Sequence, residues 1–444
     1  MFLKSFLEAF NQNFTLFFIF PSIIGIGVYF TCKLRCIQIT QMKQSIQCLT
    51  QKNTGALGSI SRFGALSAVL AGNFGTGNIS GMAIAVATGG PGALVWMWLM
   101  AFFGAVIQYA SCVLGVSFRR QSKNGDYSGG PMYYLRDGLG YKKLAAFFAL
   151  FTIFGAITVG NFAQINSIIL PLQKMGLNSF YCTLFIGCMV ALVTLGGIQR
   201  LAKFASLIVP LKAVIYLGTA SFIIFTHYEQ AFAALKLMFA CALNPASALG
   251  GAMGFGTLKA ITTGFDRGLF ATDAGTGIVP ILQANARSEH PAMDGIATLV
   301  APFMVMIVCT ATGLVLILTG AWLQPELQST NMVTYAFSAG LGTPAGGHIV
   351  IATLTLFAYT TILAWSYCGE KALEFLIGPG KALWFRLGFV ALVPIGGFIQ
   401  VGMIWTLSDI AITLMLFINL IGIVKLSHRV FDANRSFKEL RKAT

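Results

Sequence analysis

The chain has 444 residues, of which 56% are hydrophobic and only 10% charged, and it carries a formal net charge of +15. A soluble domain carries about 25% charged residues, so this composition, with a mean hydropathy of +0.78, excludes a chain that folds mainly in water. The nine cysteines contain no CxxC pair and the four histidines have no metal-binding spacing. This pattern argues against a disulfide framework and a resident metal.

Long charge-free apolar runs predict an all-α membrane protein with about eleven transmembrane helices, because about 20 apolar residues span a bilayer. The segment before the first span contains Glu8 and lacks a small-residue cleavage site, so we expect the first helix to be retained. The predicted spans are 14–31, 61–88, 93–116, 145–169, 178–198, 204–226, 258–286, 295–320, 346–367, 386–402 and 405–424.

Most of the 29 Lys and Arg residues fall in alternate loops and in the last segment. Loops rich in these residues stay on the cytoplasmic side. We therefore expect an amino terminus outside, a cytoplasmic carboxy terminus and a place in the plasma membrane, the inner membrane in a bacterium. The basic balance indicates topology and no nucleic-acid partner. Lys212 and Arg267 are basic residues in the interior of predicted spans, away from the span ends.

The spans predict one polytopic membrane unit without a second domain. An extra first helix, 14–31, precedes a first repeat, 61–226, and a second repeat, 247–424, and residues 425–444 form a cytoplasmic tail. Without the extra helix ten spans remain. The first and the sixth of these, 61–88 and 258–286, are each interrupted by a glycine-rich segment. Five spans separate corresponding positions, so the two repeats insert with opposite orientation, as in the inverted five-plus-five transporter architecture.

Two glycine-rich segments interrupt these apolar spans. The first reads AGNFGTGNISG (71–81), and the second reads ATDAGTGIVP (271–280). Broken helices at membrane depth are tolerated where the freed backbone lines a cavity. A matched pair of breaks is the best sequence pointer to the binding site of a secondary transporter. The alternative is that these glycines only allow helices to pack closely.

Exposed carbonyls at such breaks can hold a cation, and half-helix amino termini attract a carboxylate. We therefore predict a substrate between the two breaks. Gln164, on the fourth span, faces this pocket or joins two helices. Asp273 holds a substrate ammonium, helps bind a cation, or pairs with Arg267, whereas Asp409 caps or pairs helices. The candidate substrate-binding residues are Asn73, Thr76, Gly77, Gln164, Asp273, Gly275 and Thr276.

A second candidate site lies on the ninth span. Its adjacent hydroxyl groups, together with carbonyls of the first break, predict a sodium site built from hard oxygen ligands. The alternative is that each threonine bonds only to its own helix. Lys212 is a candidate coupling residue, because a lysine ammonium could take the place of sodium there. The candidate sodium ligands are Asn73, Asn78, Thr360 and Thr361.

Several segments resemble the alanine or glycine:cation symporter family over nearly the whole chain. The resemblance implies a leucine-transporter-like fold and sodium-coupled import of small neutral amino acids: alanine, glycine and D-alanine. It also implies that both breaks and the Gln164 region form the amino-acid pocket. The matching segments are GTGNISGMAIAVATGGPGALVWMW (75–98), GGPMYYLRDGL (129–139), RGLFATDAG (267–275), TTILAWSYCGEKALE (360–374) and WTLSDI (405–410).

Four departures from the family pattern bear on the coupling ion rather than on the substrate class. Relatives commonly show SNEAGMG at the second break, where this chain has an aspartate, Asp273. An apolar residue is usual at the position of Lys212. The remaining departures replace charged or polar family residues by Gln108, Ser111 and the Pro302-Phe303 pair.

The leading hypothesis is a monomeric sodium symporter that works by alternating access in the bilayer. It needs no catalytic residue and no cofactor besides its coupling ion. The alternative is a proton-coupled or exchange-type amino-acid permease with Lys212 in place of sodium. A channel would need repeated pore loops, and an intramembrane protease would need paired aspartates or a Ser/His set. The glycine-rich segments lack the Lys-Ser/Thr of a phosphate loop, which argues against an ATP-driven pump.

Overall fold

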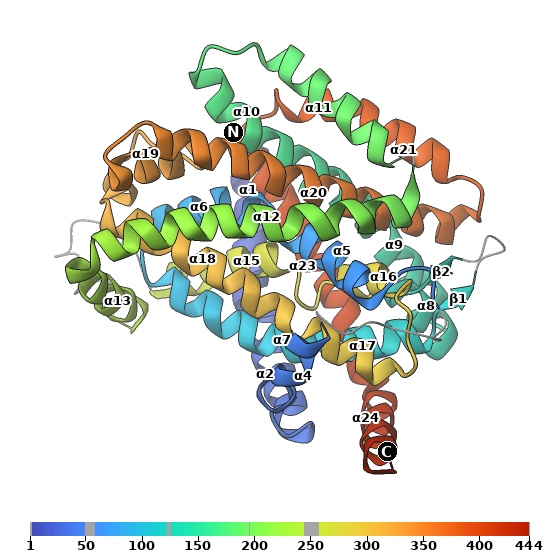
Figure 1. Cartoon of the computed structure of the whole chain (residues 1–444). Coiled ribbons are helices and arrows are strands. Elements are labelled where there is room, and N and C mark those ends of the chain that lie inside the picture. The colour runs from blue at the N-terminus through green and yellow to red at the C-terminus, as the bar shows by residue number, and fades with distance from the viewer. Residues whose placement is uncertain (1, 49–57, 122–125, 195, 244–256, 444) are drawn as a thin grey trace.

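The chain folds into a bundle of long helices, shown in a computed structural model (Figure 1). Among the described residues, seven helices are long and apolar enough to cross a membrane, and shorter apolar helices accompany them. The predicted all-α membrane class is therefore confirmed. The described residues are 2–48, 58–121, 126–194, 196–243 and 257–443.

The first half of the chain extends from the amino-terminal helix α1 to helix α13, which follows the sixth predicted span. Its only sheet in the described part is a hairpin of β1 (Arg120–Gln121) and β2 (Tyr127–Ser128). Its helices are α1 (Phe2–Phe14), the π-helix η1 (Thr15–Ile19), α2 (Phe20–Lys33), α3 (Ile37–Thr40), α4 (Met42–Gln47), α5 (Arg62–Asn73), the 3-10 turn η2 (Thr76–Asn78), α6 (Ser80–Gly89), α7 (Ala93–Ser117), α8 (Pro131–Tyr133), the π-helix η3 (Tyr134–Gly138), α9 (Lys142–Ile157), the π-helix η4 (Thr158–Phe162), α10 (Ala163–Lys174), α11 (Ser179–Thr194), α12 (Gly197–Thr226) and α13 (Tyr228–Leu243).

The second half begins, in the described part, with the second broken helix. Its elements are α15 (Thr257–Thr272), α16 (Ile278–Gln283), α17 (Pro291–Thr298), α18 (Val300–Leu318), the 3-10 turn η5 (Ala321–Leu323), α19 (Thr330–Leu341), α20 (Ala345–Ile377), α21 (Ala382–Ala391), α22 (Val393–Gly396), α23 (Val401–Lys425) and α24 (Ser427–Ala443).

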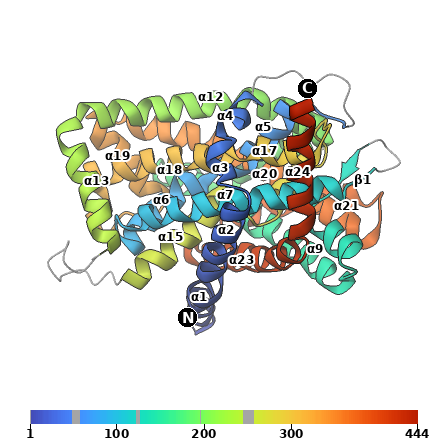
Figure 2. The same ribbon diagram turned by 90° about the horizontal axis from the view of Figure 1, so that it is seen from below.

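Two broken helices cross the centre of the bundle. The first consists of α5 and α6, and the second of α15 and α16. The segment after the first break, α6, packs against the segment before the second break, α15, while α5 packs against α16. The two helices therefore run antiparallel, as an inverted repeat requires. In Figures 1 and 2, α6 and α15 lie towards the end of the bundle that carries α13.

The structure departs from the predicted spans in several places. The ninth span is longer than expected, since α20 continues to Ile377. The tenth, predicted at 386–402, is two short helices, α21 and α22, the second of which has Pro394 in its first turn. Helices α13, α19 and α24 lie where only loops and a tail were expected. The predicted start of the second repeat, residue 247, lies outside the described residues.

The extra first helix lies against the bundle and crosses α7 at a steep angle (Figure 2). Two of its polar side chains bind one carboxylate of the second broken helix. Asn11 Nδ2 donates to Asp266 at 3.1 Å, and Thr15 Oγ1 donates to Asp266 at 2.7 Å. Both side chains and Asp266 are buried. These bonds attach the first helix to α15.

We expect Thr15→Val to loosen this attachment, because it removes a donor from a buried carboxylate while nearly preserving side-chain shape. A hydrogen bond between membrane helices contributes on the order of 1 kcal/mol. The melting temperature of the detergent-solubilised protein should therefore fall. Thr219→Val is the matched control, since the Thr219 hydroxyl bonds only to the Ile215 carbonyl of its own helix. Equal melting temperatures for the two variants would contradict this assignment.

Candidate substrate and cation site

The first broken helix is held open by a glutamine from a neighbouring helix. Helix α5 ends at Asn73, and α6 begins at Ser80 after a single 3-10 turn. The N–H of Thr76 donates to Gln164 Oε1 at 3.0 Å, and Gln164 Nε2 donates to the Val159 carbonyl at 3.0 Å. That carbonyl lies in the π-helical turn η4, an irregularity frequent at functional sites. Gln164 therefore faces the break.

The close approach of α20 requires a glycine at the first break. A Cβ atom at Gly75 would lie 2.7 Å from Thr361 Oγ1 and 3.1 Å from Gln164 Oε1. Thr361 Oγ1 lies 2.8 Å from the Ala71 carbonyl and 3.1 Å from the Gly72 carbonyl, to which it donates. Helix α20 therefore binds the last turn of α5 directly beside the break.

The second break depends on left-handed backbone. Helix α15 ends at Thr272, and α16 begins at Ile278. Between them, Gly275 and Gly277 have φ angles of +88° and +93°, which glycine adopts without a steric penalty. Asp273 has a φ of 50°, an uncommon conformation for a residue with a side chain. This turn directs Asp273 away from the helical path of α15.

A buried amide from the last long helix satisfies the second break. Asn419 Nδ2, on α23, donates to the Gly275 carbonyl at 2.7 Å. The same amide group lies 3.1 Å from Ser111 Oγ, and the Tyr134 hydroxyl donates to Asn419 Oδ1. These contacts orient Asn419 towards the break.

The two breaks contact each other. Asn73 Nδ2 donates to the Thr272 carbonyl at 2.7 Å. A Cβ atom at Gly77 would lie 2.7 Å from the Phe270 ring, so the backbones approach closely here as well. Four buried polar atoms on and beside the breaks have no hydrogen-bond partner in the described structure. They are Asn73 Oδ1, Thr76 Oγ1, Asp273 Oδ1 and Trp365 Nε1.

Asp273 is a buried acid without a cation partner among the described residues. The Asp273 side chain is 1% exposed and lies beside the Trp365 indole. Burying a charge is costly unless it is paired and hydrogen-bonded. Asp273 therefore offers acceptor capacity that a ligand with N–H donors could use.

A cationic side chain lies on the other side of the first break. Lys212 Nζ, from α12, donates to the Phe74 carbonyl at 2.9 Å and to Thr360 Oγ1 on α20. Lys212 is fully buried. The structure thus brings together the first break, one predicted sodium ligand and the predicted coupling residue.

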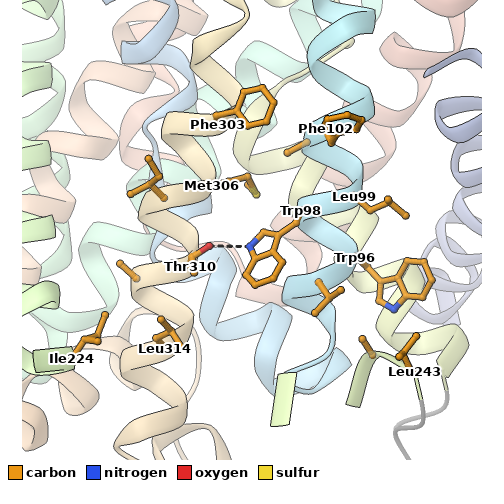
Figure 3. Close-up of a pocket in the computed structure, with 15 residues that line it drawn as sticks. Trp96, Trp98, Leu99, Phe102, Ile224, Leu243, Phe303, Met306, Thr310 and Leu314 are labelled. Carbon is orange, nitrogen blue, oxygen red and sulfur yellow. Dashed lines mark hydrogen bonds between the residues drawn. The ribbon is translucent and has the colours of Figure 1, made fainter. Parts of the chain in front are cut away.

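Two cavities lie near the bundle core. A polar cavity of about 950 Å³ opens beside α6 and α15, and its lining includes Arg267, Trp405 and Asp409. An apolar cavity of about 980 Å³ lies between α7, α12, α13 and α18 (Figure 3). In the apolar cavity, Trp98 Nε1 donates to Thr310 Oγ1 at 2.9 Å. The apolar cavity offers no charged group to a zwitterion, whereas the breaks carry buried polar atoms without partners in the described structure.

Comparison with known proteins identifies the family. The family model described as the sodium:alanine symporter family matches residues 1–444. The chain belongs to the sodium:alanine symporter family. It is 35% identical to the sodium/alanine symporter AgcS of Methanococcus maripaludis, over 95% of this chain and 94% of AgcS. It is 40% identical to an uncharacterized transporter of Haemophilus influenzae, over 93% of this chain and 91% of that protein.

A solved structure shows the fold of this symporter. The crystal structure of MhsT in complex with L-phenylalanine matches with a TM-score of 0.56 at 14% identity, over 84% of this chain and 90% of MhsT. The expected leucine-transporter-like architecture, with two broken helices, is thereby confirmed. Membership in this family supports sodium-coupled amino-acid symport as the class of activity and shows that the protein is not an enzyme.

The structure overturns one pairing considered for this symporter. Asp273 does not pair with Arg267. The Arg267 guanidinium instead forms a buried ion pair with Asp409 on α23. The physical reason is that residues six apart on a helix do not face each other, and Asp273, just past the end of α15, has left-handed backbone.

The structure also separates residues that were expected to act together. Asn78 does not join the threonines of α20: its Nδ2 donates to the Asn73 carbonyl at 3.1 Å, and its own carbonyl accepts from Thr312 at 2.9 Å. Thr276 donates to the Asp273 carbonyl at 2.8 Å, which stabilises the second break. These bonds assign both side chains to the backbone of the breaks.

Sequence reasoning missed Asn419 and Ser111 as partners of the second break. Asn419 is a lone amide in an apolar span, and such residues usually face the protein interior. That signal could have singled it out. No sequence feature linked it to the Gly275 carbonyl, which lies 144 residues earlier.

We expect Gly77→Leu to abolish transport while the protein remains inserted and monodisperse. The new side chain would meet the Phe270 ring, and the Ala271 backbone at 3.3 Å, where the two breaks touch. Alanine uptake into proteoliposomes should fall at least tenfold, because forcing apart a packed contact costs about 1–3 kcal/mol. Gly218→Leu is the matched control, since a Cβ atom there meets nothing within 4 Å. Wild-type uptake by Gly77→Leu would show that the break lies away from the substrate.

Proposed function

We propose that this chain carries small neutral amino acids, such as alanine and glycine, across the plasma membrane by alternating access. The observation that carries this proposal is the set of unpartnered polar atoms where the two breaks touch. Buried polar atoms are normally hydrogen-bonded, and an exception calls for an explanation such as a ligand. A zwitterion has donors and acceptors at opposite ends and would satisfy these atoms.

The chemistry of the breaks supports one orientation of the substrate. Asp273 Oδ1 and Asn73 Oδ1 are acceptors, which suit the ammonium group. The Thr76 hydroxyl is a donor, and α6 begins at Ser80 with its amino-terminal end at the first break. Donors and a helix amino terminus suit a carboxylate. Gly77, Gln164, Gly275 and Thr276 would shape the backbone around this ligand.

Tight packing around Trp365 supports a small substrate. Trp365 is fully buried, and a Cβ atom at Gly160 would lie 2.2 Å from Trp365 Cβ. Phe162 packs against Gly396 of α22 instead. We therefore assign the limiting wall to Trp365.

The relatives and the charge pattern support the remaining parts of the proposal. Positive residues on alternate loops favour an amino terminus outside and a cytoplasmic carboxy terminus. The extra helix, the two repeats and the tail would form one polytopic carrier that works as a monomer, bound only to lipid, ion and amino acid. Sodium is the coupling ion in the family name, whereas the contacts of Lys212 favour the alternative, in which Lys212 takes the place of sodium.

The test of this function is counterflow of radiolabelled alanine in proteoliposomes that contain the purified chain. We expect unlabelled alanine and glycine inside the vesicles to drive label uptake, and leucine and phenylalanine to have no effect. One or two extra methylenes give modest discrimination in a yielding apolar pocket, so rejection must come from a rigid wall. Counterflow driven by leucine as strongly as by alanine would contradict a small pocket.

We expect Asp273→Asn to raise the apparent alanine constant about tenfold. The substitution keeps side-chain shape but removes the charge that faces the ammonium, and a factor of ten corresponds to about 1.4 kcal/mol. The control is Asp432→Asn on the exposed surface of α24. An unchanged alanine constant in Asp273→Asn would exclude contact between Asp273 and the substrate.

A further inference from the structure

The middle of α12 carries a lysine that is fully buried. Lys212 has 0% exposure. A lysine near a helix end can extend its head group to the membrane interface, but a head group with no exposure does not reach water or lipid head groups. No carboxylate among the described residues pairs with it. A buried ammonium without an anion must be stabilised by neutral groups.

Neutral oxygen atoms and aromatic rings provide that stabilisation. Lys212 Nζ donates to the carbonyl of Phe74 at 2.9 Å and to the hydroxyl of Thr360. The ammonium also lies 4.6 Å from the ring centre of Phe357 and 5.9 Å from that of Phe74. Aromatic faces attract cations, most strongly where water is excluded. This environment is built to hold a positive charge.

The oxygen atoms around the ammonium are those of a cation site between two helices. The Phe74 carbonyl lies in the break after α5, where helical pairing is lost. Thr360 and Thr361 lie on α20, and both hydroxyl oxygens lie within hydrogen-bond distance of the Phe357 carbonyl, at 3.0 and 3.1 Å. Carbonyls and hydroxyls are the hard ligands that small cations prefer. Lys212 therefore reaches this cluster of oxygen atoms from a third helix, α12.

We propose that the Lys212 ammonium is the resident cation of this site, so that alanine binding by this chain requires no sodium ion there. This inference rests on the proposed function, since it concerns the ion that accompanies the amino acid. A sodium ion beside the ammonium would place two like charges a few ångströms apart away from water, which is unfavourable. The Phe74 carbonyl and the Thr360 hydroxyl can therefore bind the Lys212 ammonium or a sodium ion, but not both.

The contacts also explain how an attached cation could replace a free one. A cation here joins the first broken helix to α20, as the bond from Lys212 joins the Phe74 carbonyl to Thr360. Helices α5, α12 and α20 pack against one another, so the lysine stem reaches across a single interface. The ammonium is covalently attached and therefore available without a sodium gradient.

The first test uses the wild-type chain alone. Counterflow of radiolabelled alanine is measured in proteoliposomes, with sodium or N-methylglucamine as the only cation on both sides. We expect the two rates to agree within about twofold. A sodium-dependent rise of tenfold or more would overturn the inference, whatever the behaviour of any variant.

The second test asks whether sodium can take the place of the ammonium. Lys212→Ala removes the charge and opens space beside Thr360. We expect its counterflow to fall at least tenfold in N-methylglucamine and to be restored by sodium in a saturable manner. Lys203→Ala is the matched control, because Lys203 lies on the same helix with an exposed side chain. Undiminished counterflow of Lys212→Ala without sodium would overturn the inference.

These outcomes separate the two proposals. If the wild-type chain shows no alanine counterflow with either cation, the proposed amino-acid transport fails. If counterflow is present but requires sodium, transport stands and the role of Lys212 fails. Rescue of Lys212→Ala by sodium is a response that loss of packing alone would not produce.

Discussion

The need to satisfy backbone polar groups freed at two helix breaks organises this structure. Where the surrounding medium is apolar, each unpaired N–H or C=O costs several kcal/mol. Each of four helices supplies one partner: Gln164 for the Thr76 N–H, Lys212 for the Phe74 carbonyl, Asn73 for the Thr272 carbonyl and Asn419 for the Gly275 carbonyl. The positions of α10, α12 and α23 around the broken pair follow from these bonds.

The same bonds explain why the proposed substrate and cation sites share one centre. A break that was fully satisfied from within the protein would have no capacity left for a ligand. Here the four backbone groups named above have side-chain partners, while side-chain atoms of Asn73, Thr76 and Asp273 have none in the described structure. The partners hold the breaks in shape, and the remaining side-chain atoms are free to bind. Rigid backbone with unsatisfied side chains is a preorganised site, which lowers the cost of binding.

The sequence predicts the parts of this arrangement that depend on local composition. Apolar runs predict the long helices, and glycine with asparagine and threonine predicts both breaks, because few other reasons place such residues at membrane depth. It does not predict which side chain meets which backbone group. Arg267 and Asp409 are 142 residues apart, and nothing in either segment marks the pair. Asp273 was open to pairing with Arg267 because the two residues are only six apart, and the sequence does not show that Arg267 meets a carboxylate on α23 instead.

Short helices escaped prediction for a different reason. Helix α19, in what looked like a loop, is fixed by packing against α20 rather than by its own pattern. The hydroxyl groups of its Thr330 and of Ser80, at the start of α6, form a hydrogen bond of 2.7 Å. Helices of this length are marginal on their own, so only the assembled bundle decides that they form. Local sequence patterns contain no information on that support.

Contacts made by α15, on the stretch before the second break, separate the polar cavity from the breaks. Arg267 pairs with Asp409, and the rings of Phe270 and Trp405 lie 4.5 Å apart between that pair and the breaks. The Arg267 guanidinium pairs with Asp409 and not with the neighbouring Asp266. The Asp266 carboxylate instead accepts hydrogen bonds from Asn11 and Thr15. In the proposed alternating access, α15 would part from α23 to open the breaks to this cavity. Because the first helix binds the same segment of α15, it must either move with α15 or leave Asp266 without donors, and the cost of the second option favours joint motion.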